Sequence, residues 1–276
     1  MAVKEGYKIL LNDLRSPIVG FQYEVGAKYT HEGKVVLEHS GFHFFEYSMD
    51  AKRYSSSEWT ARYFRVRASG TIIHGTYMST CSCIEILNEI AEADLGKEMP
   101  KYIKRLDGTE EWYDDNGLLH SYDDKPAFKN VKGELAWYSH GKKHRDGGKP
   151  AYIWKSDGVY EWWQEDKLHR EGDKPAYVCL NDTRNIVKWF IDGKVTREND
   201  EPACIDDAYG VRWIINNMVH RYTKTEVSMD DPEHHIGPPA DIMRNGFQRW
   251  FIGGLLYHEK TTPDPAAIEI VKKYFQ

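Results

Sequence analysis

Cysteine is scarce in this chain of 276 residues, which contains four, at Cys81, Cys83, Cys179 and Cys204. Their number and scatter exclude a disulfide framework of the kind that stabilises small secreted domains. Cys81 and Cys83 are also spaced too closely for a CxxC redox or zinc half-site. We therefore expect reduced thiols, as in a cytosolic protein.

Long hydrophobic runs are missing as well. The first residues have no apolar core like that of a signal peptide, and no stretch approaches the roughly 18 apolar residues of a membrane span. Because 41% of the residues are hydrophobic and 29% are charged, the composition predicts a globular cytoplasmic protein without a membrane partner.

Basic charge is not in excess, since 37 Lys and Arg residues stand against 43 Asp and Glu residues, a net charge of -6. Nucleic acid is therefore not expected as a partner, because binding to the phosphate backbone needs clustered positive charge. Catalytic signatures are also lacking: the chain contains no phosphate-binding GxxxxGKS/T loop, no GxGxxG, no HExxH and no GxSxG. The sequence identifies no enzyme and predicts no cofactor and no metal site.

What the chain does contain is a unit of about 25 residues that recurs from residue 105 onward. Six tryptophans mark six copies, at spacings of 25, 25, 27, 24 and 37 residues, and a proline follows each in step: Trp112, Trp137, Trp162, Trp189, Trp213 and Trp250, with Pro126, Pro150, Pro175, Pro202, Pro239 and Pro265. A fixed period of this kind indicates a repeat architecture.

Each copy has the pattern of short β-hairpins. In the third, residues 150–155 and 159–163 are expected to pair around the turn at Ser156-Asp157-Gly158, and residues 168–170 to form a short third strand. A lone hairpin is unstable in water, so the copies should share one sheet. We predict a mainly antiparallel β-hairpin array, a sheet or solenoid, over residues 97–276, closed by a C-terminal capping helix after Pro265.

Residues 1–96 have a different pattern, which predicts an α+β domain. Alternation indicates strands over residues 7–11, 21–26, 34–38, 42–47, 62–68 and 70–75. We expect one helix over residues 48–54 and an amphipathic helix over residues 84–91. Gly96 and Pro100 mark the boundary between the two parts.

Two resemblances concern the origin of the chain. The Trp…His-Arg…Pro-Ala hairpin unit resembles the MORN repeat in layout, with a different consensus, and Trp-Tyr-x-x-Gly-x-x-His-Arg repeats are similar to those of phages and large DNA viruses. The segments 19–29 and 40–44 resemble an uncharacterised N-terminal domain of bacteriophage proteins. Together they imply a phage-encoded protein in the host-cell cytoplasm, and they imply no activity.

A further resemblance involves Gly41-Phe42-His43-Phe44-Phe45 and Ala51-Lys52-Arg53-Tyr54, which are similar to the central part of ADP-ribosyltransferase folds. In those enzymes a tyrosine flanks the nicotinamide, which implies that role for Tyr54. The expected strand over residues 62–68 lacks the glutamate that orients the ribose. The alternative is that Tyr54 and Phe42 are ordinary core aromatics.

The candidate binding residues form a periodic row: His144-Arg145, His169-Arg170 and His220-Arg221. Imidazoles and guanidiniums in a row could hold an anionic ligand or an acidic protein face. Alternatively, each His bonds a turn carbonyl and each Arg pairs with an acid such as Asp146 or Glu171, so that the row serves only the scaffold.

His234 and His235 are further candidates, because they lie in an insertion between Arg221 and Pro239 that breaks the period. A long loop at the edge of a sheet suits partner contact better than metal binding here, since ligands so close in sequence rarely face one ion.

The sequence as a whole predicts a protein-binding module that inhibits or redirects a host protein, such as a defence protein, through its repeat surface. Two alternatives stay open: an ADP-ribosyltransferase-like enzyme in residues 1–96, and a sponge that sequesters a nucleotide immune signal on the His-Arg row.

Overall fold

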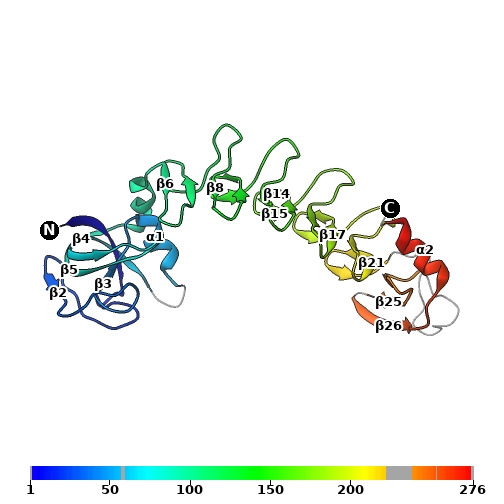
Figure 1. Cartoon of the computed structure of the whole chain (residues 1–276), viewed down its shortest axis with the longest axis horizontal. Coiled ribbons are helices and arrows are strands. Elements are labelled where there is room, and N and C mark those ends of the chain that lie inside the picture. Colours follow the sequence, from blue (N-terminus) through cyan, green and yellow to red (C-terminus); the bar gives the residue numbers. More distant parts are fainter. Residues whose placement is uncertain (1, 57–59, 222–237, 253, 275–276) are drawn as a thin grey trace. The chain divides into compact units, whose positions relative to one another are not determined.

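A computed structural model of the chain describes residues 2–56, 60–221, 238–252 and 254–274. The chain forms two compact units, residues 1–121 and 122–276, and both consist mostly of antiparallel β-sheet (Figure 1). Among the described residues, no helix is long and apolar enough to cross a membrane.

The first unit is organised around an antiparallel sheet in the order β1-β4-β5-β2, with β3 also paired to β5. Its elements are β1 (Val3–Leu10), β2 (Lys28–Thr30), β3 (Phe42–Phe44), α1 (Ser48–Tyr54), β4 (Arg62–Ile73), β5 (Ser79–Ile90), the 3-10 helix η1 (Glu92–Glu98), β6 (Tyr102–Lys104) and β7 (Glu110–Trp112). Neighbouring residues of β1 belong to different buried clusters, since Ile9 packs with Met49 of α1 and Leu10 packs with Phe64. Both faces of the sheet are therefore covered.

The structure corrects part of the predicted secondary structure of this unit. The helix expected over residues 84–91 is wrong, because residues 84–90 form the end of β5, which pairs along its length with β4. The strands expected over residues 21–26 and 34–38 reduce to isolated bridges, Arg15 with Gln22 and Val36 with Ser40. The helix over residues 48–54 is confirmed as α1.

The second unit is a ladder of antiparallel strands that pair in chain order, seen side by side in Figure 1. They are β8 (Phe128–Lys129), β9 (Glu134–Ala136), β12 (Tyr152–Trp154), β13 (Val159–Glu161), β16 (Tyr177–Leu180), β17 (Asn185–Lys188), β20 (Cys204–Asp206), β21 (Gly210–Arg212), β24 (Asp241–Met243), β25 (Gln248–Ile252) and β26 (Leu255–Lys260). Gly158 takes a φ of 65° in the turn between β12 and β13, as the predicted hairpin requires.

A second, smaller hairpin follows each of four ladder strands. These hairpins are β10 (Tyr138–Ser139) with β11 (Lys142–Lys143), β14 (Trp163–Gln164) with β15 (Lys167–Leu168), β18 (Phe190–Ile191) with β19 (Lys194–Val195), and β22 (Ile214–Ile215) with β23 (Met218–Val219). Backbone bonds join each to the next, for example from Gly193 N to Leu168 O at 2.9 Å. The small hairpins therefore form a second row along the array.

The end of the array carries the predicted helix, α2 (Pro265–Lys273). Asp264 caps it by accepting a bond from Ala266 N at 2.9 Å. Ala267 and Val271 of α2 pack in one buried cluster with Val211, Trp213 and Ile242, among others. Burial of this face of the sheet is thus confined to the copies nearest α2.

The first sequence copy lies in the first unit as far as residue 121. Arg105, Glu111 and Tyr113 are buried there, and Arg105 binds Asp50 of α1. The predicted division at residues 96 and 97 precedes the division of the structure at 121 and 122, because these contacts tie β6 and β7 to the first unit.

Candidate binding surface of the repeat array

An arginine lies over a tryptophan ring in four successive copies. The guanidinium carbon is 3.7 to 3.9 Å from the ring centroid in each: Arg145 over Trp137, Arg170 over Trp162, Arg197 over Trp189, and Arg221 over Trp213. The same arginines donate from Nη1 to the carbonyl oxygen of the proline that follows, Pro150, Pro175, Pro202 or Pro239, at 3.0 to 3.4 Å. These arginines therefore hold the chain reversal of their own copy.

Three of these arginines make one more contact, with a carboxylate of the preceding copy. Nε and Nη2 donate together to one aspartate: Arg145 to Asp124 at 2.7 and 3.2 Å, Arg197 to Asp173 at 2.6 and 2.6 Å, and Arg221 to Asp200 at 2.7 and 2.8 Å. This is the two-pronged pairing that guanidinium geometry favours. Hydrogen bonding to Arg197 lowers the pKa of Asp173. The partners are thus these aspartates, and not Asp146 or Glu171 as the scaffold alternative suggested.

The histidines of the row also contact neighbouring copies. His144 Nε2 lies 3.1 Å from an oxygen of Asp146, and its Nδ1 lies 3.3 Å from Glu165 of the next copy. His169 Nδ1 accepts from Asp192 N at 3.2 Å. The side chains of His144 and His169 therefore contact acids and a backbone amide of the array.

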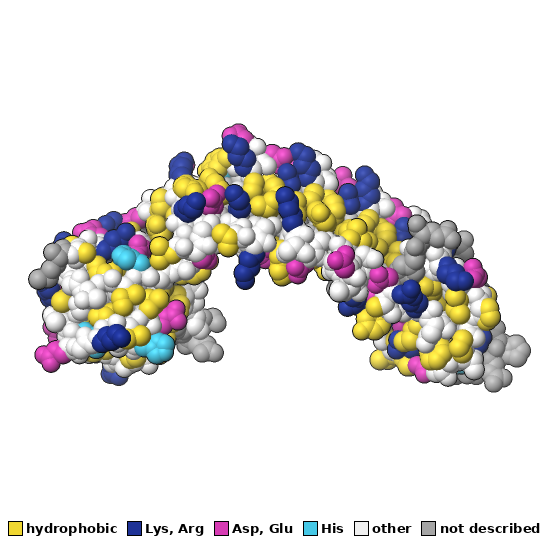
Figure 2. Space-filling model, in the orientation of Figure 1, with side chains coloured by type: hydrophobic (Ala, Val, Ile, Leu, Met, Phe, Trp, Pro, Cys, Tyr) yellow, Lys and Arg dark blue, Asp and Glu magenta, His cyan; other side chains and the backbone are white. Residues whose placement is uncertain are grey.

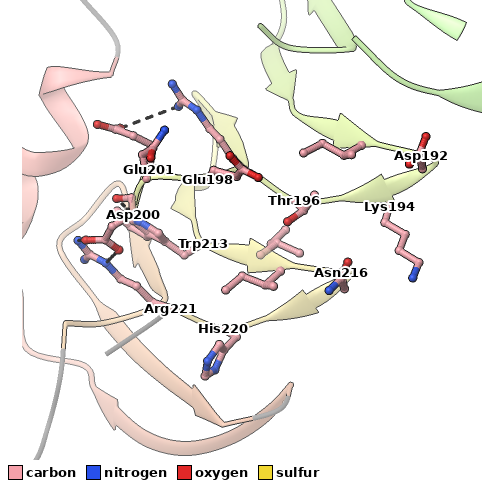
Figure 3. Close-up of a pocket in the computed structure, with 15 residues that line it drawn as sticks. Asp192, Lys194, Thr196, Glu198, Asp200, Glu201, Trp213, Asn216, His220 and Arg221 are labelled. Carbon is pink, nitrogen blue, oxygen red and sulfur yellow. Dashed lines mark hydrogen bonds and ion pairs between the residues drawn. The ribbon is translucent and has the colours of Figure 1, made fainter. Parts of the chain in front are cut away.

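Grooves between successive copies bring members of the row together. The larger, of about 590 Å³, is lined by Arg197 of one copy and by His220 and Arg221 of the next. In Figure 3, Arg221 points at Asp200, and Asp192, Lys194 and Asn216 lie at the other end of the groove. Its cations, Lys194, Arg197 and Arg221, face four acids, Asp192, Glu198, Asp200 and Glu201. This balance does not favour a polyanionic nucleotide.

A second groove, of about 360 Å³, lies one copy earlier and contains His169, Arg170 and Arg197. The structure thus places Arg197 in both grooves, although Thr196 breaks the His-Arg pattern there. His234 and His235 lie outside the described residues, so their predicted contact with a partner stays a prediction.

Tyr54 ends α1 in the first unit, with 43% of its surface exposed and its ring 5.4 Å from that of Phe45. It lines a cavity of about 590 Å³ that also contains the carboxylates of Glu38 and Asp50. Arg105 binds both oxygens of Asp50, whereas Glu38, the other carboxylate that lines this cavity, is not bound by Arg105. The enzymatic role of Tyr54 stays a prediction.

Lys8 is a residue that sequence reasoning missed. It lines a neighbouring cavity of about 450 Å³, is 5% exposed, and donates from Nζ to His43 O at 2.7 Å. Burial lowers the pKa of Lys8 to about 8. A lysine in an alternating strand is typical of a solvent-facing position, so the sequence carries no signal for this burial.

Comparison with known proteins covers the first unit alone. A family model described as a domain of unknown function (DUF7666) matches residues 4–98. No curated protein and no solved structure matches the chain. Residues 4–98, which include Lys8 and Tyr54, are thus similar to a family whose function is unknown.

Proposed function

We propose that the chain is a protein-binding module that recognises its partner with the middle of its MORN-like repeat sheet. One observation carries this proposal: no residue of β12 or β13 is buried, although these strands lie in the interior of the ladder. Antiparallel sheets ordinarily bury one face. Tyr152 and Trp154, which share one face of β12, are instead half-buried, and they supply aromatic surface that a partner would cover.

The chemistry of this surface suits a protein partner. Lys143 lies 4.9 Å from the ring centroid of Tyr152 and 4.6 Å from that of Trp163, so cations and aromatic rings alternate there. Figure 2 shows hydrophobic side chains interleaved with Lys and Arg side chains along the array. Tyrosine, tryptophan and arginine are the residues that most often dominate binding energy at protein interfaces.

The partner in this proposal is a host protein, which binding inhibits or redirects. The support is the resemblance of the repeats and of the first domain to phage proteins. Such a module needs an extended rigid surface and no catalytic group. The rows of hairpins in the second unit, which backbone hydrogen bonds join to one another, offer such a surface.

The test is affinity capture from bacterial lysate with the full chain as bait and quantitative mass spectrometry as readout. We expect one protein in near-stoichiometric amount. Tyr152→Glu and Trp154→Lys, on the same face of β12, should each weaken its binding by at least about thirtyfold, the effect of losing a contact worth about 2 kcal/mol. Val131→Lys, at a position 73% exposed outside the strands, is the control. Capture of no stoichiometric protein, or equal capture by all variants, would refute the proposal.

A second candidate function rests on the cavity beside Tyr54. An ADP-ribosyltransferase needs an exposed aromatic ring for the nicotinamide, and Tyr54 offers one next to Arg53 and His74. Incubation of the full chain with labelled NAD and lysate should transfer label, and Tyr54→Ala should abolish the transfer. No transfer by the unaltered chain rejects this candidate.

A further inference from the structure

The four arginines that lie over tryptophan rings form an arginine row, and three of them bind an aspartate of the preceding copy. Arg170 is the exception. The aspartate that binds each arginine stands two residues before the proline of the preceding reversal, at Asp124, Asp173 and Asp200. In the copy that precedes Arg170, the residue two positions before the proline, Pro150, is Gly148. Among the described residues, no carboxylate lies within ion-pair distance of Arg170, and its Nε and Nη2 have no hydrogen-bond partner.

Everything else in the copy is built as in its neighbours. Arg170 lies 3.8 Å above the Trp162 ring centroid and donates to Pro175 O at 3.1 Å. Trp162 Nε1 donates to Gly148 O at 2.7 Å, as Trp137 Nε1 donates to Asp124 O at 3.0 Å. The Arg170 guanidinium is therefore held in the orientation that binds a carboxylate in the sister copies.

The backbone at the empty position also matches a sister copy. Gly147 and Gly148 have φ values of 74° and 66°, close to the 52° and 57° of Asp123 and Asp124. An aspartate thus adopts this conformation one copy earlier, and glycine is not required for it.

The place of the missing carboxylate is open. A Cβ atom added to Gly148 would meet no atom within 4 Å. Trp162 is half-buried, whereas the corresponding rings of Trp137, Trp189 and Trp213 are at most 9% exposed. Partial burial lowers the pKa of Arg170, and no carboxylate offsets the effect.

We propose that Arg170, Trp162 and Gly148 form a binding site for the carboxylate of an aspartate or glutamate on the partner protein. The partner's carboxylate takes the place that Asp124, Asp173 and Asp200 take in the other copies and accepts from Nε and Nη2 of Arg170. A carboxylate is favoured over other anions because the three sister sites bind that group. This inference rests on the proposed function and specifies the chemistry of the partner: an acidic segment that lies across the third copy.

The first experiment needs no partner protein. Side-chain Nε–Hε resonances of the full chain, labelled with ¹⁵N, are recorded during titration with N-acetylaspartate methylamide, and Arg170→Lys identifies the Arg170 signal. We expect a saturable shift of that signal, and no shift with the uncharged N-acetylasparagine methylamide. Gly148→Asp should abolish the response, because its own carboxylate fills the site. Gly148→Asn, which tolerates the same backbone and carries no charge, should retain most of it.

Three results would overturn the site: no shift beyond that caused by chloride at equal ionic strength, an unchanged response in Gly148→Asp, or a response to inorganic phosphate alone. With a captured partner in hand, Gly148→Asp should weaken its binding by at least about tenfold relative to Gly148→Asn. Failure of the capture with a positive titration would refute the proposed function and leave the carboxylate site standing, so the two failures are distinguishable.

Discussion

Replacing Arg105 by methionine should remove the centre of a buried charge network in the first unit. The side chains of Arg105 and Asp50 are each 1% exposed, and that of Glu111 is 4% exposed. Arg105 donates to the two oxygens of Asp50 at 2.5 and 2.9 Å and to Glu111 at 2.7 Å. Methionine preserves the length and the apolar stem of the side chain and removes every one of these bonds.

The expected loss of unfolding free energy follows from the buried carboxylates of Asp50 and Glu111, which remain when Arg105 is removed. Asp50 would keep only its longer contact with Arg53, at 3.5 Å, and Glu111 would keep the Tyr113 hydroxyl as a donor at 2.8 Å. Removing one member of a buried charge pair costs about 3–5 kcal/mol, because the remaining charge is neither hydrated nor fully compensated. That is a large part of the total stability of an ordinary domain, about 5–15 kcal/mol. Lys97→Met, which breaks an exposed pair with Asp94, should cost less than about 1 kcal/mol.

The loss should also depend on pH. Burial raises the pKa of Asp50, and Arg105 works against that rise. Without Arg105 the folded state would bind more protons than the unfolded state, so the destabilisation should be smaller at about pH 4 than at about pH 7. Guanidinium unfolding followed by circular dichroism, with hydrogen exchange of the β5 amides to isolate the first unit, measures both effects. A cost below about 1 kcal/mol at neutral pH, or no change with pH, would refute the reasoning.

Three further predictions concern stability. Gly158→Ala should destabilise the second unit by about 2–4 kcal/mol in thermal melts, because its Cβ would lie 1.8 Å from Leu180 O. Gly147→Ala, which is also at positive φ but in open space, is the control and should cost about 1–2 kcal/mol. Equal costs for the two variants would contradict the steric argument. Lys8→Met should stabilise the first unit by about 1–3 kcal/mol at pH 7, since the pKa of Lys8 is lowered to about 8 in the folded chain. Stability of the unaltered chain should then rise as pH passes from about 8 toward 10, where only the unfolded state keeps the proton, and a flat profile would argue against a charged lysine buried at a cost. Ile242→Ala should cost about 2–5 kcal/mol by opening a cavity under α2, and a change below about 1 kcal/mol in chemical denaturation would place this side chain outside the core.

The sequence by itself determined the local structure of the hairpins. Glycine, asparagine and aspartate stand at turn positions that need positive φ, such as Gly158, Asp166 and Asn216-Asn217, and these turns fix the strands on either side. Asp264 before Pro265 likewise marked the start of α2. The sequence also contains a signal for the open carboxylate position: Gly148 stands where three other copies have aspartate, as a position-by-position comparison of the copies shows.

Only the tertiary structure decided the features that depend on distant partners. Residues 84–90 can satisfy a helical or an extended pattern, and pairing with β4 settles the choice, because Ile84 and Ile86 then enter one buried cluster and Ile90 enters the other. Arg105, which binds Asp50 of α1 and Glu111 of β7, helps to place the division between the units after residue 121, which no local composition marks. The role of each arginine in the row also depends on its spatial neighbours. An arginine bound to the aspartate of the preceding copy is part of the scaffold, as Arg221 is with Asp200. Arg170 donates to Pro175 O and keeps Nε and Nη2 for a ligand. Sequence periodicity shows that these residues recur, but the charge available for binding depends on which acids lie beside them in space.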